Sequence, residues 1–286
     1  MNKKFFIPSV NFHIWETCNM KCKYCFATFQ DVKQSILPKG HLEKDEAVKI
    51  VKLLADFGFQ KITFAGGEPT LCRWLPDLIK TAKNAGMKTM IVTNGNLLNN
   101  KFLEINRNNL DWISISIDSL NELTNLKIGR AIAGKKALQR NNYIKIVDNV
   151  LRLEYRLKIN TVVNRSNFNE DMNDFIQYAK PERWKVLQTL PVEGQNDKCI
   201  DDLSVSREEF MLFVHRHRAN KCLVSETDKQ MVNSYVMIDP AGRFFNNETG
   251  KYIYSRKILE SGIENTFREM NYDPCKFKSR KGLYLW

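Results

Sequence analysis

The amino-acid sequence predicts an α/β fold, an open parallel sheet or partial barrel of about five or six strand–helix units. Three observations lead to this prediction. Helical and strand patterns alternate from residue 43 onward, and single helices separate consecutive strands. Strands joined in this way run parallel, with right-handed crossovers. The 286 residues, 43% of them hydrophobic, are enough to bury a sizeable core.

Helices are predicted where apolar residues recur at helical spacing. In the stretch 43–59, Ala47, Ile50, Val51 and Leu54 fall on one face. Gly86 follows a second such pattern and is expected to end that helix. The predicted helices are 43–59, 75–86, 143–156, 170–180 and 207–218.

Short apolar runs between these helices predict the strands. They cover 61–65, 88–93, 110–119, 157–164 and 183–194. After residue 194 the alternation loosens to one helix, a strand at 234–240 and a lysine-rich tail that ends in Trp286. We therefore expect a core domain, 1–194, and a C-terminal extension, 195–286, that covers the substrate site.

Composition and charge narrow the class of protein. The net charge of +12, from 44 basic and 32 acidic residues, suits an anionic partner, although a solvated basic surface explains it equally well. No apolar run approaches the roughly 20 residues of a membrane helix. The apolar part of residues 1–13 is too short for a signal peptide. Seven cysteines, an odd number, argue against a secreted disulfide framework. We expect a cytoplasmic protein with no membrane contact.

Three cysteines, Cys18, Cys22 and Cys25, lie within eight residues, and Tyr24 precedes the last of them. Structural zinc needs four ligands, and no second cysteine pair follows. A [4Fe–4S] cluster held by three thiolates instead leaves one iron open to a further ligand. The spacing favours such a cluster. The remaining cysteines are isolated: Cys72, Cys199, Cys222 and Cys275.

Glycine and polar residues follow the predicted strands. "AGGEPT" follows 61–65, "TNGN" follows 88–93, "SID" occupies 116–118 and "NRSN" follows 157–163. Parallel α/β proteins bind ligands at the carboxyl ends of their strands. The cysteine triplet precedes the first strand–helix unit, so we expect it on a loop at the same mouth.

Basic residues alternate along the predicted strands. Lys61 begins one strand, Lys158 and Asn160 share one side of another, and Arg183 and Lys185 repeat the alternation on a third. Basic side chains that point into a barrel need an anion as a partner. A triphosphate would supply it. The alternative is that these strands expose one polar face to water.

The motifs "CNMKCKYC" and "GGEP" resemble the two hallmarks of the radical S-adenosylmethionine (SAM) superfamily. Further blocks, from "NFHIWETCNMKCKYCFATF" through "LKINTVVNRSNFNEDM" to "CLVSETDKQMVNSYVMID", are similar to the viperin family in the same order over nearly the whole chain. The resemblance implies a partial (β/α)6 barrel of the radical SAM type. It also implies a [4Fe–4S] cluster on the three cysteines, whose open iron binds SAM and whose reduction yields a 5′-deoxyadenosyl radical.

The resemblance further implies a nucleotide dehydratase. The expected reaction converts CTP, or alternatively GTP or UTP, to the 3′-deoxy-3′,4′-didehydro analogue, an antiviral chain terminator. It assigns Tyr235 as hydrogen donor to the substrate radical. SAM would contact Gly66, Gly67, Glu68, Pro69, Thr93, Asn94, Ser116 and Arg130. The triphosphate and nucleotide would contact Lys61, Lys158, Asn160, Arg183 and Lys185.

Partners and alternatives complete the expectations. An electron donor must reduce the cluster, and a cluster-assembly factor is expected at the C-terminus, where a short tail keeps the final tryptophan. Only 17 residues precede Cys18, so no membrane-anchoring helix is expected there. "FFNNETG" is expected to border the base, and His215 and His217 to lie on a solvated helix face.

Two alternative functions remain open. They are a radical SAM enzyme that modifies RNA or a peptide, and a nucleic-acid-binding protein with a structural metal. No appended RNA-binding module is visible.

Overall fold

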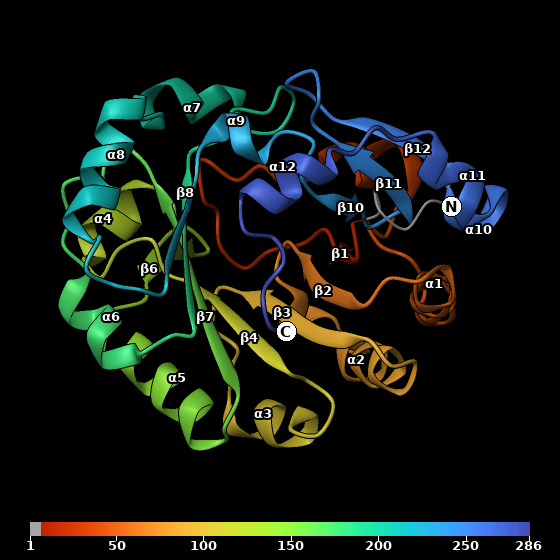
Figure 1. Cartoon of the computed structure of the whole chain (residues 1–286), viewed down its shortest axis with the longest axis horizontal. Coiled ribbons are helices and arrows are strands. Elements are labelled where there is room, and N and C mark those ends of the chain that lie inside the picture. The colour runs from red at the N-terminus through yellow and green to blue at the C-terminus, as the bar shows by residue number, and fades with distance from the viewer. Residues whose placement is uncertain (1–6) are drawn as a thin grey trace.

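The computed structural model describes residues 7–286 (Figure 1). Residues 1–6, part of the stretch predicted not to be a signal peptide, lie outside the described residues. Ten strands of the described chain form one sheet in the order β12-β11-β10-β1-β2-β3-β4-β7-β8-β9. From β10 to β9 every neighbouring pair is parallel. Because no described pair joins β9 to β12, the barrel is open.

Six parallel strands form the centre of this sheet. They are β1 (Ser9–Trp15), β2 (Lys61–Gly66), β3 (Lys88–Thr93), β4 (Trp112–Ser116), β7 (Arg156–Val163) and β8 (Arg183–Gln188). The helices that follow them cover the outer face (Figure 1). They are α1 (Lys44–Phe57), α2 (Leu75–Asn84), α3 (Asn100–Asn106), α4 (Glu122–Lys127), α5 (Arg140–Arg152) and α6 (Asn173–Ala179). The predicted partial (β/α)6 barrel is confirmed.

The sequence analysis missed β1, which pairs with both β2 and β10. A strand with parallel neighbours on both sides lacks the simple alternation that marks a half-buried strand, and the burial pattern of β1 is accordingly irregular. Predicted bounds were also too long where polar loops follow a strand. The strand predicted at 183–194 ends at Gln188, for example.

Residues after 194 extend the same sheet at both ends. β9 (Leu223–Glu226) pairs with β8, and β10 (Val236–Ile238) pairs with β1 and leads into the antiparallel β11 (Arg243–Asn246) and β12 (Ile253–Lys257). The helices of this part are α7 (Asp197–Leu203), α8 (Arg207–Arg216), α9 (Asp228–Met231), α10 (Ile258–Ser261), α11 (Ile263–Arg268) and α12 (Pro274–Ser279). A small separate hairpin joins β5 (Ala131–Ile132) to β6 (Lys136–Ala137). The division of the chain at residue 194 stays a prediction.

Alternate residues of β2 show how the fold builds a site. Ile62 and Phe64 are fully buried in the main hydrophobic cluster, together with Ile50 and Leu54 of α1. The intervening residues of β2, Lys61 among them, line the barrel interior instead. Since successive side chains of a strand point to opposite faces, the apolar layer under the helices leaves every second position free to face the interior.

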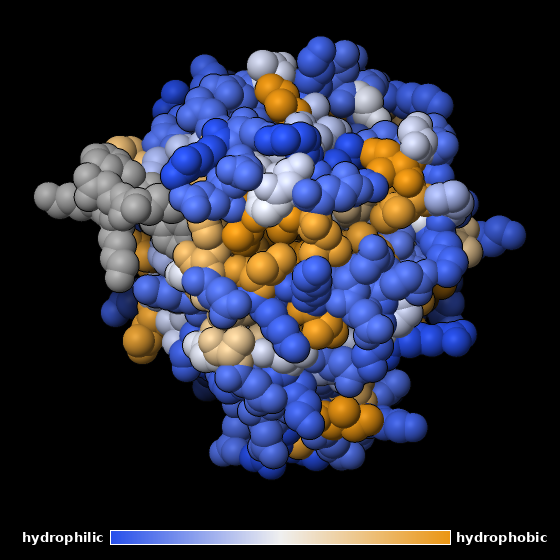
Figure 2. Space-filling model, turned by 90° about the vertical axis from the view of Figure 1, so that its right-hand side faces the viewer, coloured by the Kyte–Doolittle hydropathy of each residue, from blue (hydrophilic) through white to orange (hydrophobic). Residues whose placement is uncertain are grey.

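The outer surface is mostly hydrophilic, as Figure 2 shows for the face that carries α1 and α11, where apolar side chains gather in a band across the middle. In the described part of the chain, no helix combines the length and the apolar character needed to cross a membrane.

One predicted surface residue is buried. His217, expected on a solvated face beside His215, has no exposed surface; its Nε2 accepts a hydrogen bond from the Met172 amide at 2.9 Å. Its ring lies 5.1 Å from that of Trp184 on β8. The prediction for His217 was wrong because the end of α8 packs against the sheet at this position. His215 is exposed, as predicted.

Candidate active site

The barrel encloses a cavity of about 300 Å³. Its lining includes every predicted site residue except Pro69, which begins the short 3-10 turn η3 (Pro69–Leu71) beside it. The cysteines and the "GGEP" turn lie at the carboxyl ends of the strands, and Lys61 lies at the first residue of β2. The cavity therefore runs along the strands from a thiol end to a cationic end.

The cysteine loop, residues 16–25, follows β1 and is held by backbone hydrogen bonds to the segment after α4. The Lys21 amide donates to the Gly129 carbonyl at 3.2 Å, and the Lys23 amide donates to the Ile128 carbonyl at 2.9 Å. Gly129 has a φ of +76°, and a Cβ there would stand 2.2 Å from the Lys21 carbonyl oxygen. Only glycine allows this close approach at that φ.

The "GGEP" turn connects the cysteine loop to the end of β3. A Cβ on Gly67 would lie 2.3 Å from two carbonyl oxygens of the cysteine loop. The buried Glu68 carboxylate accepts hydrogen bonds from the Thr93 hydroxyl at 2.7 Å and from the Asn94 amide at 2.8 Å. Burial raises the pKa of Glu68, and these donors oppose that shift. The Glu68 backbone amide also donates to the Thr17 carbonyl at 3.0 Å, so Glu68 joins the cysteine loop, its own turn and the end of β3.

A second buried carboxylate, Asp118, lies beneath the cysteine loop. Arg130 Nη1 lies 3.0 Å from Asp118 Oδ2 and 4.0 Å from Cys22 Sγ. The Tyr24 hydroxyl donates to the same carboxylate, and Arg130 also donates to the Ser116 carbonyl. Asp118 was not predicted as a site residue, although it ends the "SID" stretch noted above. It ties the cysteine loop to β4 and to Arg130.

At the other end of the cavity lie four buried cations: Lys61, Lys158, Arg183 and Lys185. The parallel pairing of β7 with β8 sets Lys158 beside Arg183 and Asn160 beside Lys185. The four are at most 8% exposed, so these strands do not present their polar face to water. The alternative of solvent-exposed basic strands is thereby excluded.

A fifth buried cation, Arg280, reaches the same cavity from the residue that follows α12. Arg280 lies in the lysine-rich tail, where no alternation of strands and helices is visible in the sequence, so the sequence analysis did not identify it. Among the ion pairs of residues 7–286, Glu226 is the one carboxylate that meets any of the five cations, and it pairs with Lys185 and Arg280. Lys61 and Arg183 instead donate hydrogen bonds to the C-terminal tail, to the Tyr284 hydroxyl and the Lys281 carbonyl.

Burial, together with the neighbouring cations, lowers the pKa of the lysines. Burial lowers the pKa of Lys158 to about 7, and the neighbouring Arg183 adds to the shift. Burial likewise lowers the pKa of Lys61 and of Lys185, but the adjacent Glu226 carboxylate opposes the shift at Lys185 and favours its charged form. Cations in a low-dielectric interior are unfavourable unless an anion compensates them. The cluster is therefore electrostatically suited to receive an anion.

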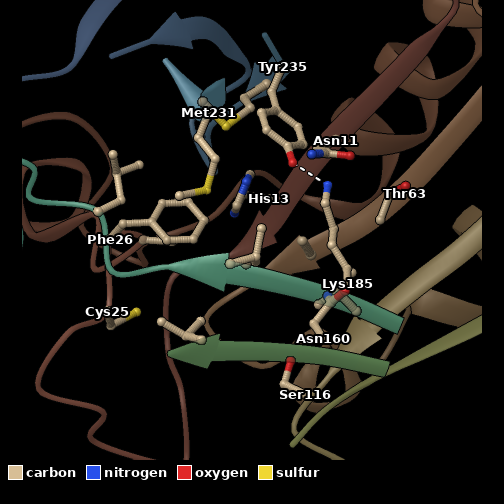
Figure 3. Close-up of a pocket in the computed structure, with 18 of the residues that line it drawn as sticks. Asn11, His13, Cys25, Phe26, Thr63, Ser116, Asn160, Lys185, Met231 and Tyr235 are labelled. Atoms are coloured by element: carbon tan, nitrogen blue, oxygen red, sulfur yellow. Dashed lines mark hydrogen bonds between the residues drawn. The ribbon is translucent and has the colours of Figure 1, made fainter. Parts of the chain in front are cut away.

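On the side of the cationic end that faces the thiol end, Tyr235 and Lys185 meet from opposite walls of the cavity, with Asn11 beside them (Figure 3). The sequence analysis missed His13, which is 3% exposed and whose Nδ1 has no partner within residues 7–286. Its ring packs 5.1 Å from that of Phe29. Burial lowers the pKa of His13 to about 3, so the imidazole is neutral at physiological pH.

Comparison with known proteins agrees with this geometry. The family model described as "Radical SAM superfamily" matches residues 13–203. A protein of Flammeovirga pacifica named S-adenosylmethionine-dependent nucleotide dehydratase is 57% identical over 98% of this chain and 96% of its own length. The chain belongs to the radical SAM nucleotide dehydratase family. The viperin-family resemblance is thereby confirmed, and an Oncorhynchus mykiss relative named S-adenosylmethionine-dependent nucleotide dehydratase RSAD2 is 34% identical over 97% of this chain and 80% of its own.

A Lacinutrix mariniflava relative of the same name as the first is 55% identical over 98% of this chain, which spans 59% of that protein's length. Among solved structures, native anSMEcpe with bound AdoMet superposes with a TM-score of 0.69 at 15% identity, over 95% of this chain and 82% of that one. Streptococcus suis SuiB bound to S-adenosylmethionine gives 0.65 at 16% identity, over 84% and 60%. At these identities the likeness shows a shared fold.

As a member of this superfamily, the protein uses a [4Fe–4S] cluster and SAM as cofactors. Within residues 7–286, no three metal-ligating side chains converge on a point that could hold a single ion. A tetrahedral zinc site needs such convergence, whereas the thiolates of a cluster each bind a different iron. Cys18, Cys22 and Cys25 on one short loop, facing one cavity, fit the second arrangement. These three residues would hold the cluster.

Replacing Cys18, Cys22 or Cys25 with alanine should abolish iron retention, because two thiolates cannot hold a cluster with an open iron. The measurement is iron and sulfide content after anaerobic reconstitution. Cys199→Ala is the matched control, since Cys199 packs in the same small hydrophobic cluster as Tyr24 and Cys22. It should keep a full complement of iron. Iron loss in the Cys199 variant, or full iron in any of the other three, would overturn the ligand assignment.

Proposed function

We propose that this protein converts a nucleoside triphosphate to its 3′-deoxy-3′,4′-didehydro analogue, with CTP as the first choice and GTP or UTP as alternatives. The observation that carries the proposal is the single cavity with three thiols at one end and five buried cations at the other. The name that the relatives share, nucleotide dehydratase, supports it.

Charge favours a triphosphate as the anion. Five cations and one carboxylate, Glu226, leave a net charge of about +4 when every lysine is protonated, close to the three to four negative charges of a nucleoside triphosphate. Arginine and lysine form charge-assisted hydrogen bonds to phosphate oxygens. An RNA-modifying or peptide-modifying enzyme is the runner-up, but the cations lie inside the barrel, where a single nucleotide has better access than a polymer.

In the proposed mechanism, the chain's own residues anchor and orient the substrate. Lys61, Lys158 and Arg183 bind the phosphates, and Asn160 contacts the nucleotide. The ribose then extends along the strands toward the thiol end. When bound, the cluster and SAM supply the radical that removes a hydrogen atom from the ribose. Apolar lining residues such as Phe26 and Met231 limit the access of water.

Tyr235 then supplies a hydrogen-atom equivalent. Loss of hydrogen from C4′ leaves a carbon radical, and the C3′–O bond must break as the C3′–C4′ double bond forms. One electron completes that double bond and one proton leaves with the hydroxyl as water. Tyr235 lines the cavity and its hydroxyl lies beside Lys185, which supports this role. A one-electron donor must afterwards restore the tyrosine.

The wider context is part of the same proposal. The product would end viral nucleic-acid chains in the cytoplasm, and a cluster-assembly factor would bind the C-terminus. There, Trp286 lies 5.4 Å from Lys61 Nζ, while Leu283 and Leu285 are exposed. Asn247, from the "FFNNETG" stretch expected near the base, is buried and lines the cavity. It is a candidate reader of the base edge.

The first test is turnover. Reconstituted protein with dithionite and SAM should form 5′-deoxyadenosine only when its true triphosphate is added, because the radical is used on a correctly held substrate. Chromatography of reactions with CTP, UTP, GTP and ATP measures 5′-deoxyadenosine and the didehydro product. Stimulation by none of the four would argue for a macromolecular substrate.

The phosphate anchors give a second prediction. Lys158→Ala should weaken CTP binding tenfold to a hundredfold, since a charge-assisted hydrogen bond contributes about 1.5 to 3 kcal/mol. The loss should be smaller for CMP and absent for cytidine. Anaerobic calorimetry provides the affinities, and Lys83→Ala, whose lysine pairs with Asp111 outside the cavity, is the control. An equal loss for all three ligands would mean that Lys158 supports the fold.

Binding should also take up protons. Lys158 has a pKa of about 7 in the free protein, and a bound phosphate raises that pKa because it favours the charged form. Above about pH 7, and well above the phosphate pKa of about 6, a mostly neutral lysine must therefore gain a proton. CTP affinity should fall as the pH rises from about 7 to about 9. Calorimetry at pH 8 in two buffers of different ionisation enthalpy measures the uptake, which Lys158→Ala should reduce. Binding without proton uptake would contradict this.

A further inference from the structure

Glu226, the last residue of β9, is a buried carboxylate directly behind the cavity wall. It does not line the cavity, but its three partners do. Its Oε1 lies 2.7 Å from Lys185 Nζ and 3.3 Å from Arg280 Nη1, and its Oε2 accepts a hydrogen bond from the Tyr235 hydroxyl. One carboxylate thus joins groups from three separate parts of the chain.

The Tyr235 hydroxyl has two polar neighbours with opposite properties. It donates its proton to Glu226 and accepts a hydrogen bond from Lys185. The Arg280 guanidinium packs 3.6 Å from the centre of the tyrosine ring. The phenol is therefore fixed in one orientation, with its proton aimed at a carboxylate rather than at the centre of the cavity.

Glu226 is ionised throughout the working pH range. Burial would raise its pKa, but Lys185 and Arg280 outweigh burial and lower the pKa to about 2. A free carboxylate is consequently always present to accept a proton. A neutral phenol holds its proton tightly, but an oxidised phenol is a strong acid and gives its proton even to a weakly basic carboxylate.

We propose that Glu226 takes the phenolic proton of Tyr235 when that tyrosine gives its electron to the substrate radical, and that Lys185 protonates the departing 3′-hydroxyl. This inference rests on the proposed dehydratase function. The tyrosine O–H bond breaks, its electron completes the C3′–C4′ double bond, and its proton moves to Glu226. Lys185 releases a proton to form water. Transfer from Glu226 back to Lys185, across 2.7 Å, restores the ion pair. The tyrosyl radical that remains is reduced by the one-electron donor together with a proton.

This proton relay from Tyr235 through Glu226 to Lys185 predicts that a variant of Glu226 changes the yield of didehydro product but not that of 5′-deoxyadenosine. Glu226→Gln keeps the shape of the side chain but cannot take up a proton at this site. 5′-Deoxyadenosine should still form at a near wild-type rate, because hydrogen abstraction precedes the relay. The amount of didehydro product per 5′-deoxyadenosine should fall on the order of tenfold. CTP affinity should not fall more than about threefold, since Glu226 binds no phosphate and its neutralisation leaves the site more positive.

Tyr235→Phe should lower the same ratio, and the double variant should be no worse than Tyr235→Phe alone, because residues that act in one step are not additive. Asp239→Asn is the control. Asp239 is equally buried and pairs with Arg243 at 2.7 Å, but it lies outside the cavity. This variant should keep the wild-type ratio, which separates a loss of buried charge from a loss of the relay.

If Glu226→Gln does not fold, a measurement on the wild-type protein can still test the relay. In deuterium oxide the product ratio should fall, because the relay moves exchangeable protons whereas abstraction from C4′ does not. An unchanged ratio in Glu226→Gln, an additive double variant, or a wild-type ratio that is the same in both solvents would overturn the relay while leaving the dehydratase proposal intact. Wild-type protein that forms no didehydro product from any triphosphate would contradict both.

Discussion

The arrangement of the site depends on the cost of burying cations. Lys61, Lys158, Arg183 and Lys185 take inward positions on three parallel strands, and Arg280 joins them from the end of the chain. Removing a charged group from water is expensive unless a partner compensates it. The fold compensates two of the five with the carboxylate of Glu226 and gives others hydroxyl or carbonyl acceptors. It leaves the cluster short of anions, and this unfavourable electrostatic state of the free protein is relieved when a polyanion binds.

The thiol end of the cavity differs, because its buried carboxylates have hydrogen-bond donors for nearly all of their acceptor positions. Glu68 accepts from the end of β3 and Asp118 from the cysteine loop and Arg130. Buried polar networks of this kind stabilise a single arrangement when every member has a partner. The result is a rigid support for the loop that carries the three cysteines, and Met20 of that loop also packs in the main hydrophobic cluster. The glycines permit it, because a side chain at Gly67 would collide with the loop backbone.

Much of this could be predicted from the sequence, and the reasons are local. The helical spacing in α1 and the alternation of Lys158 with Asn160 and Arg183 with Lys185 are properties of short segments, so pattern alone places them correctly. The cysteine spacing and "GGEP" are short motifs, and they indicate the cluster and SAM without any knowledge of the fold. By contrast, β1 was missed because parallel neighbours on both sides remove its alternation. His217 was misplaced because its burial depends on which face of α8 meets Trp184, a fact of tertiary packing.

The residues that sequence reasoning could not find are those whose role arises from long-range contact. Glu226 and Arg280 are far apart along the chain, yet both contact Tyr235, the one member of this group that the family resemblance assigned. No local pattern marks the three residues as a group. The C-terminal tail makes further long-range contacts of this kind at the cationic end of the cavity. Tyr284 accepts a hydrogen bond from Lys61, and its ring centre lies 4.3 Å from the Arg183 guanidinium. Residues 195–286 thus supply the carboxylate, the tyrosine and the fifth cation that the six central strands lack. The parallel strands alone would hold a phosphate, whereas the extension adds the groups that can move a proton beside it.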